Sequence, residues 1–445
     1  MRALGHALIA AAAVLAAGAL PASAGQFNAE SFTLKNGLQV VVLPFHRAPA
    51  VTQMVWYKVG AADDPSGKSG IAHFLEHLMF RGTKETPPGA FSRIISENGG
   101  RDNAFTTEDY TAFYQTLAAD KLDLAMKLES ERMSDLVITD AKVTPEREVI
   151  IEERRTRIDN VPSALLGEQS DAALLLNNHY RLPTIGWLHE MRGLNAEDAR
   201  RFYRTWYAPN NAILIVAGDV TTKEVRALAE KYYGHIPARP VPAHVVLAEP
   251  PKVAATRLEM TSARVTSPRW RRTYLAPSYQ EAGGRPADAL TVLAELLGGG
   301  ESSRLYKSLV IEKKLATTVG TGYSGMRDGG SFILYAEPRP GVSVGEVEAV
   351  IAAEVAAFLK EGAAPEEVTR VERRLQASAV YSRDSLAGPP RIIGAALAMG
   401  RSLAEIEAWP ERIVAVTPEQ VTEIARAVLK DETAVTAVLL PERKP

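Results

Sequence analysis

The chain has 445 residues, of which 46% are hydrophobic and 23% are charged, as in ordinary folded proteins. This length predicts two or three domains. The 51 Lys and Arg residues nearly balance the 53 Asp and Glu residues, which argues against a strongly basic nucleic-acid-binding protein. Because the sequence has no cysteine, it excludes disulfides, thiolate zinc sites, iron–sulfur clusters and cysteine nucleophiles. A metal site would therefore use His, Asp or Glu.

Residues 1–24 are predicted to be a signal peptide. A basic start at Arg2 precedes an apolar run from Leu8 to Leu20, and Ala22-Ser23-Ala24 gives a small-residue cleavage pattern. The run is too short for a permanent membrane span, although an uncleaved anchor is the alternative. We expect an exported chain that starts at Gly25 and has no permanent membrane anchor. It would be periplasmic if the source is a two-membrane bacterium.

The next part of the chain mixes strand and helix patterns. Asn36-Gly37 predicts a hairpin turn within residues 32–43, and residues 67–83 have apolar positions at helical spacing. Further strands are predicted at 51–59, 112–117 and 211–218. Helices are predicted within 121–204 and at 220–232.

Proline then becomes frequent in residues 235–251, which predicts an extended linker. The segments after it repeat the earlier order of parts. Strands are predicted at 269–274, 331–336 and 434–440, and helices at 286–297, 301–313, 345–358, 365–380 and 417–429. We therefore expect a signal peptide (1–24), a first domain (25–234), the linker (235–251) and a similar second domain (252–445). The irregular alternation favours an α+β fold with mainly antiparallel sheets packed with helices.

The strongest chemical signal is His73-Phe-Leu-Glu76-His77. On a helix, residues four apart share a face, so both imidazoles can bind one metal ion. Glu76 would lie beside that ion, where a carboxylate can take a proton from bound water. The alternative is a helix whose histidines are only structural. The functional interpretation needs a third ligand.

An acid-rich segment at 145–154 offers candidates for that ligand. Pro145 favours the first turn of a helix. Glu146 and Glu153 are seven residues apart and lie on one helical face, whereas Glu152 points away from it. A solvated charged helix is the competing interpretation.

This combination resembles the inverted-zincin motif of the pitrilysin family, which includes insulin-degrading enzyme and the mitochondrial processing peptidase. Segments 78–83, 98–106, 206–212 and 302–305 also resemble family segments, and the length matches the short, two-domain members. The resemblance implies that His73, His77 and Glu153 bind one zinc ion per chain, and that Glu76 is the general base. It implies that Glu146 is an acid that orients the site.

The resemblance also implies how substrate binds. Family members hold a peptide as an added strand at a sheet edge beside the zinc, and the matching residues here are Asn103, Ala104, Phe105 and Thr106. Pairing through the main chain tolerates many peptide sequences. An ordinary edge strand is the alternative.

One segment departs from the family pattern. Active members carry an Arg and a Tyr seven residues apart in the second half, where they stabilise the tetrahedral intermediate. Val310 and Thr317 stand at these positions, while Arg304 and Tyr323 are nearby at other offsets. In two-domain members, two chains enclose one chamber like a clamshell. We therefore expect the pair to come from a homologous partner chain; otherwise the chain is a homodimer.

Two hypotheses follow. The first is a zinc endopeptidase subunit that hydrolyses short or unfolded peptides. The second is a non-proteolytic structural or assembly subunit of the same fold. Complete zinc ligands favour the first, because a scaffold has no need of them.

Overall fold

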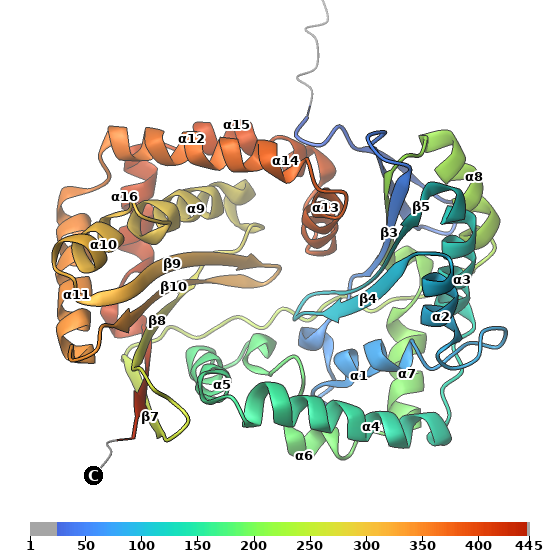
Figure 1. Cartoon of the computed structure of the whole chain (residues 1–445), viewed down its shortest axis with the longest axis horizontal. Coiled ribbons are helices and arrows are strands. Elements are labelled where there is room, and N and C mark those ends of the chain that lie inside the picture. The colour runs from blue at the N-terminus through green and yellow to red at the C-terminus, as the bar shows by residue number, and fades with distance from the viewer. Residues whose placement is uncertain (1–24, 443–445) are drawn as a thin grey trace, which may run out of the picture.

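The computed structural model describes residues 25–442, which fold into two α+β halves that lie side by side (Figure 1). The predicted signal peptide lies outside the described residues. The first half contains a six-stranded sheet in the order β1-β2-β6-β3-β5-β4. Its strands are β1 (Glu30–Thr33), β2 (Gln39–Pro44), β3 (Ala50–Tyr57), β4 (Arg101–Thr106), β5 (Thr111–Ala118) and β6 (Ala212–Gly218).

Helices cover one face of this sheet and enclose the larger hydrophobic core of the first half. Phe74, Leu75 and Leu78 of the first helix point into that core and are almost completely buried. The helices are α1 (Ile71–Leu78), α2 (Ala90–Glu97), α3 (Leu122–Ser134), α4 (Asp140–Arg154), α5 (Pro162–Leu174), α6 (Leu188–Met191), α7 (Ala196–Trp206) and α8 (Thr222–Tyr233).

The second half contains a five-stranded sheet in the order β7-β11-β8-β10-β9. Its strands are β7 (Thr256–Ser262), β8 (Arg269–Ala276), β9 (Ala316–Met326), β10 (Gly329–Pro338) and β11 (Val435–Pro441). Its helices are α9 (Arg285–Gly298), α10 (Arg304–Tyr306), α11 (Val344–Glu361), α12 (Pro365–Ser382), α13 (Gly388–Ala398), α14 (Leu403–Glu407), α15 (Trp409–Val414) and α16 (Pro418–Val428).

The two halves repeat one topology. The strand order β2-β6-β3-β5-β4 corresponds to β7-β11-β8-β10-β9, and both sheets contain a single parallel pair, β2 with β6 and β7 with β11. All other pairs are antiparallel. This confirms the predicted α+β fold with two similar halves. Pairing with a second chain stays a prediction.

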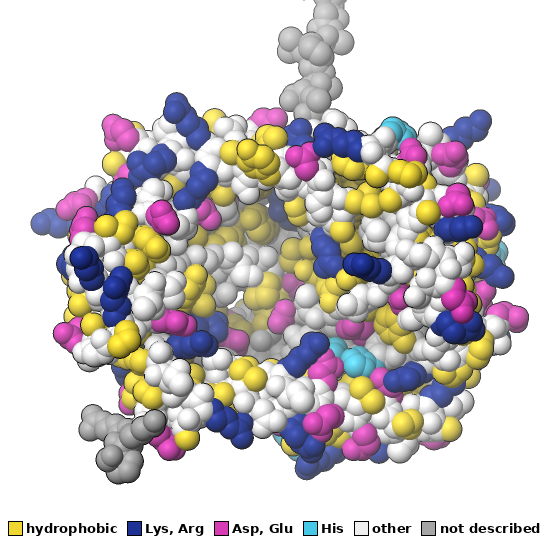
Figure 2. Space-filling model, viewed as in Figure 1, with side chains coloured by type: hydrophobic (Ala, Val, Ile, Leu, Met, Phe, Trp, Pro, Cys, Tyr) yellow, Lys and Arg dark blue, Asp and Glu magenta, His cyan; other side chains and the backbone are white. Residues whose placement is uncertain are grey.

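Each half also contains a helix that packs against the other half. Leu166 of α5 packs against Ala437 and Leu439 of β11, and Ile393 of α13 packs against the first sheet beside Trp56. Both are the third α-helix after the last hairpin of their half. Between α8 and β7, the chain runs without helix or strand through the proline-rich residues 235–251. The domain boundaries themselves stay a prediction. Figure 2 shows the hollow between the halves on one face of the molecule.

Several element predictions were incomplete. The helix expected at 67–83 begins only after Gly70, whose φ of 86° is left-handed, and ends at Leu78. The helix expected at 301–313 is the short α10 followed by a π-helical turn at 307–312. Strands β7 and β9 were missed. Glycines weaken the strand pattern of β9, yet a side chain at Gly320 would overlap the ring of Tyr335 on β10.

No helix within residues 25–442 is both long and apolar enough to cross a membrane.

Candidate metal centre

Helices α1 and α4 bring three potential metal ligands together. His73 and His77 lie one turn apart on α1, with ring centroids separated by 4.8 Å. Their Nε2 atoms lie 3.5 and 3.2 Å from the same oxygen, Oε2 of Glu153 near the end of α4. The three ligand atoms lie within 4.8 Å of one another, and no other group of three His, Asp or Glu side chains within residues 25–442 is arranged in this way.

The spacing of these atoms suits a zinc ion. Donors at the usual bond length of about 2.0–2.1 Å from a tetrahedral ion lie ~3.3 Å apart. The two distances to Glu153 Oε2 agree with that value. The side chains of His73, His77 and Glu153 are 12%, 23% and 15% exposed, so solvent can reach the group. Three ligands and access to solvent are typical of a catalytic site, since a structural zinc site is closed by four ligands.

A second acid orients His77. Its Nδ1 lies 2.9 Å from Oε1 of Glu146, a buried residue of α4, and Arg81 forms an ion pair with the other oxygen of Glu146. This contact leaves Nε2 of His77 facing Glu153. Burial alone would raise the pKa of Glu146, but His77 and Arg81 outweigh it and hold that pKa below its ordinary value.

The two histidines differ in their protonation. Burial and the neighbouring His77 lower the pKa of His73 to about 4. Burial also acts to lower the pKa of His77, but its hydrogen bonds with Glu146 and Glu153 outweigh that effect and raise the pKa to about 9. In the metal-free chain at neutral pH, His73 is therefore neutral and His77 carries a proton. The hydrogen bond with His77 is the main cause of a lowered pKa at Glu153, which is ionised.

Glu76 lies beside the three ligand residues without belonging to their group. It is buried, and one carboxylate oxygen, Oε2, accepts a 2.6 Å hydrogen bond from the hydroxyl of Thr106. Burial raises the pKa of Glu76 above its ordinary value, although the bond from Thr106 acts in the opposite direction.

The candidate substrate residues Asn103, Ala104, Phe105 and Thr106 all lie on β4. This strand forms the edge of the first sheet and pairs only with β5 among the described strands. Ala104 packs against the first core, and Phe105 packs edge-on against Trp56. The strand ends at Thr106, directly beside Glu76.

The side chains at 310 and 317 have no free donor for an oxyanion. Val310 packs against the hydrophobic core of the second half, and Thr317 donates to the carbonyl oxygen of Glu337. The nearby alternatives are also engaged. Arg304 forms bonds of 2.9 and 2.6 Å with Glu367, and Tyr323 donates to the carbonyl oxygen of Pro277 at 2.6 Å.

Sequence reasoning missed two arginines at the centre. Arg81 binds Glu146, and Nη1 of Arg157 lies 2.8 Å from Oε1 of Glu153. Arg157 follows Glu153 by four residues, a spacing that brings side chains together on a helix and could have pointed to this pair. The contact of Arg81 with Glu146 could not be predicted from spacing, because it forms only when α1 packs against α4.

Two consecutive parts of the chain match known protein families. Residues 40–186 match the family described as "Insulinase (Peptidase family M16)", and residues 193–375 match "Peptidase M16 inactive domain". The zinc protease PqqE of Helicobacter pylori is 32% identical over 348 residues, covering 77% of this chain and 76% of that protein. This chain belongs to the M16 peptidase family.

Other known proteins are similar to this chain over most of their length. An uncharacterized zinc protease of Streptomyces coelicolor is 30% identical over 422 residues, covering 89% of this chain and 86% of that protein. The crystal structure of a protease from Helicobacter pylori has a TM-score of 0.86 at 28% identity and covers 94% of this chain and 99% of that one. The first half of the periplasmic protease PqqL from Escherichia coli has the same fold, with a TM-score of 0.79 at 22% identity and coverage of 93% and 92%. These likenesses confirm the resemblance drawn from the sequence.

Proposed function

We propose that this M16 protein is the zinc-bearing subunit of an exported endopeptidase that hydrolyses short or unfolded peptides. The convergence of His73, His77 and Glu153 on one point beside Glu76 carries the proposal. A zinc ion held by these three residues would supply a Lewis acid that lowers the pKa of a bound water.

The chain's own residues divide the remaining work. Glu76 takes the proton of the water as general base. Because Thr106 occupies Oε2, the other oxygen of Glu76 is the one left for that proton. Glu146 holds the ring of His77 in orientation, and Arg81 holds Glu146.

The edge strand β4 supports peptides as the substrate class. A peptide laid along β4 would pair through its main chain, which is common to all peptides, and its scissile bond would lie near Glu76 at the end of the strand. Such pairing requires an extended chain. A short peptide should therefore be cleaved much faster than the same sequence inside a stable folded domain, and equal rates would argue against strand addition in an enclosed chamber.

Export is proposed from the signal-peptide pattern of residues 1–24. The periplasmic description of PqqL is consistent with it. Cell fractionation of the full-length chain, with N-terminal sequencing of the product, tests both the location and cleavage before Gly25.

The alternative is a non-proteolytic subunit of the same fold. The description of residues 193–375 as an inactive domain and the identities of Val310 and Thr317 favour it. The zinc ligands and Glu76 favour the enzyme. Purified protein that holds about one zinc ion and cleaves peptides supports the enzyme, whereas metal-free protein inactive with every homologous partner supports the alternative.

A further inference from the structure

Two equivalent hairpin turns meet where the halves approach each other. The turn between β4 and β5 carries Asp109, and the turn between β9 and β10 carries Arg327 and Asp328. These hairpins occupy the same place in the repeated topology. In Figure 1, the tip of the β9–β10 hairpin points toward β4.

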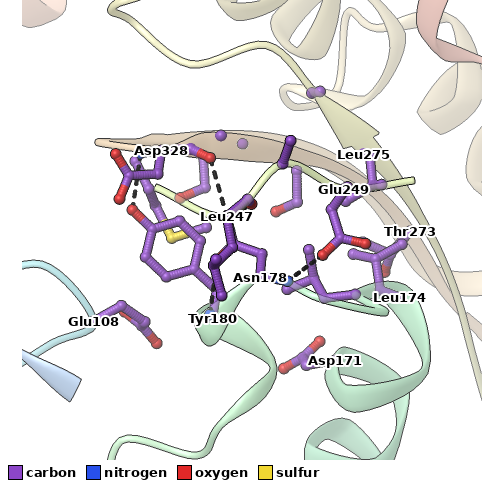
Figure 3. A pocket seen from close by; sticks show the side chains of 18 of the residues that line it. Glu108, Asp171, Leu174, Asn178, Tyr180, Leu247, Glu249, Thr273, Leu275 and Asp328 are labelled. Carbon is purple, nitrogen blue, oxygen red and sulfur yellow. Dashed lines mark hydrogen bonds between the residues drawn. The ribbon is translucent and has the colours of Figure 1, made fainter. Parts of the chain in front are cut away.

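Asp109 accepts hydrogen bonds from both sides of this junction. The backbone N–H of Arg327 donates to its Oδ2 at 2.9 Å, and the hydroxyl of Tyr180 donates to its Oδ1 at 2.6 Å. Tyr180 in turn accepts a 2.9 Å bond from the backbone N–H of Asp328 (Figure 3). One carboxylate of the first half is thereby tied to the turn of the second half directly and through a tyrosine.

Charge strengthens this connection. Nη2 of Arg327 lies 3.8 Å from Oδ1 of Asp109 and 3.7 Å from Oδ1 of Asp63, another acid of the first half. The side chains of Asp109, Asp63 and Arg327 are only 3%, 4% and 10% exposed. Buried carboxylates are costly without a compensating charge. Arg327 therefore places positive charge near two buried acids of the opposite half, while its Nε lies 3.1 Å from Oδ2 of Asp328 and Asp63 also pairs with His244 at 2.7 Å.

Hydrophobic packing is incomplete beside this contact. A cavity of about 370 Å³ opens next to it, and Tyr180, Asn178 and Asp328 line part of its wall (Figure 3). A cavity lacks the side-chain contacts that would otherwise fix two surfaces relative to each other. Hydrophobic contacts cross the junction as well, because Leu275 and Met326 of the second half pack against the cluster that contains Tyr180. The polar contacts therefore add to the local restraint between the halves.

We infer that Arg327 is a positioning residue for the edge strand β4, because its guanidinium adds charge to the backbone hydrogen bonds by which the turn of the opposite half holds Asp109. Asp109 follows the last residue of β4, Thr106, by three positions, and Thr106 holds Glu76. Fixing the turn fixes the end of the strand and the relative position of the halves together. The link to substrate binding rests on the proposed function, whereas the link between the halves does not.

Because the chain has no cysteine, spin labels can be attached at chosen positions only. The inferred link between the two halves of the chain can therefore be measured directly. Spin labels on Lys127→Cys of α3 and Gln376→Cys of α12, both exposed residues, report the distance between the halves. We expect a narrow distance distribution in the otherwise unchanged zinc-loaded protein and a broader one after Arg327→Ala. Arg257→Ala is the matched control, because Arg257 pairs with Glu348 inside the second half. An Arg327→Ala distribution as narrow as that of the control overturns the link between the halves.

Kinetics test the link to β4. Arg327→Ala should raise KM for a peptide about tenfold or more, with a smaller change in kcat and an unchanged zinc content, because a misplaced strand weakens substrate pairing. Unchanged KM in a protein with a broadened distance distribution overturns this part. An unmutated chain without peptidase activity would instead contradict the proposed function, while the distance measurement still decides the first part.

A double variant covers the case in which Arg327→Ala does not fold. Arg327→Gln leaves the carboxylate of Asp109 buried without its cation, and Asp109→Asn removes that charge. The combination should unfold at a higher denaturant concentration than Arg327→Gln alone and keep the broad distance distribution. A combination no more stable than the single variant, or one with a narrow distribution, contradicts the inference.

Discussion

Glu76 and Glu153 are both carboxylates at the candidate metal centre, but their surroundings differ. Glu153 Oε2 lies at ligand spacing from both imidazoles, whereas Oε2 of Glu76 is held by Thr106. We expect Glu76→Gln to keep about one zinc ion per chain and to lose peptide hydrolysis by about 100-fold or more, because an amide cannot accept the proton of water at neutral pH. Metal analysis and peptide turnover measure the two effects separately.

The control for this prediction is removal of a ligand. His73→Ala or Glu153→Ala should abolish stoichiometric zinc binding, since two remaining ligands hold the ion poorly. Stoichiometric zinc in both ligand variants would refute the ligand assignment. Near-normal turnover by Glu76→Gln would refute the general-base assignment.

Zinc affinity should depend on pH through one group, His77. Its pKa of about 9 in the metal-free chain means that zinc must displace a proton below that pH, whereas the lowered pKa values of His73 and Glu153 leave both already deprotonated. The dissociation constant should therefore fall about tenfold per pH unit between about pH 6.5 and about pH 8.5. Competition with a chelator of known affinity measures it. A dissociation constant that stays constant over this range would contradict the assigned protonation of His77.

Among the helices, α13 offers a test of how the halves are held together. Gly394 lies against the indole of Trp56 on β3, where a Cβ atom would overlap the ring. Gly394→Ala should therefore lower the free energy of unfolding by about 1–3 kcal/mol, because the helix must move away from the first sheet. Chemical denaturation measures the change.

Gly345 of α11 provides the matched control. The nearest atom to a Cβ at this position is 4.0 Å away, so Gly345→Ala should be neutral or stabilise the protein by up to about 1 kcal/mol. A Gly394→Ala protein as stable as the Gly345→Ala protein would mean that α13 does not pack tightly on Trp56.

The sequence predicted those elements whose signals are local. Helix α1 follows from its apolar spacing, the β1–β2 hairpin from Asn36-Gly37, and the shared face of Glu146 and Glu153 from helical geometry. Strand β9 was missed because it contains glycines, which weaken the strand pattern. At Gly320, glycine is needed because the ring of a tyrosine on the neighbouring strand leaves no room for a side chain. In the sequence alone, these glycines are more typical of a loop than of a strand.

Contacts between segments far apart in the sequence could not be predicted from local patterns either, because each partner lies on a different element. The bond from Thr106 to Glu76 joins a strand to a helix thirty positions away, and the bond from Arg327 to Asp109 joins the two halves. No periodicity encodes such pairs. The first pair follows from the packing of α1 beside β4, and the second from the meeting of equivalent hairpins of the two halves.

At the scale of the whole molecule, one chain supplies the candidate metal ligands, but the four second-half residues considered as oxyanion donors are not available for that role. Val310 packs against the core, Thr317 donates to a carbonyl oxygen, and Arg304 and Tyr323 bind Glu367 and the carbonyl oxygen of Pro277. We therefore expect weak peptidase activity from the chain alone. A homologous chain with Arg and Tyr at the matching positions should raise activity by about 100-fold or more, as expected for restoring an oxyanion donor.

The decisive measurement compares each chain alone with their mixture at equal total concentration. Glu76→Gln in this chain should abolish the gain, because the restored site would combine the first half of this chain with the second half of its partner. Val310→Arg combined with Thr317→Tyr should raise the activity of the solitary chain if its second half faces the zinc of a second copy. Full activity of the unmodified chain alone, unchanged by the partner, would refute complementation. Another donor, such as the largely exposed Arg157 beside Glu153, would then have to stabilise the oxyanion.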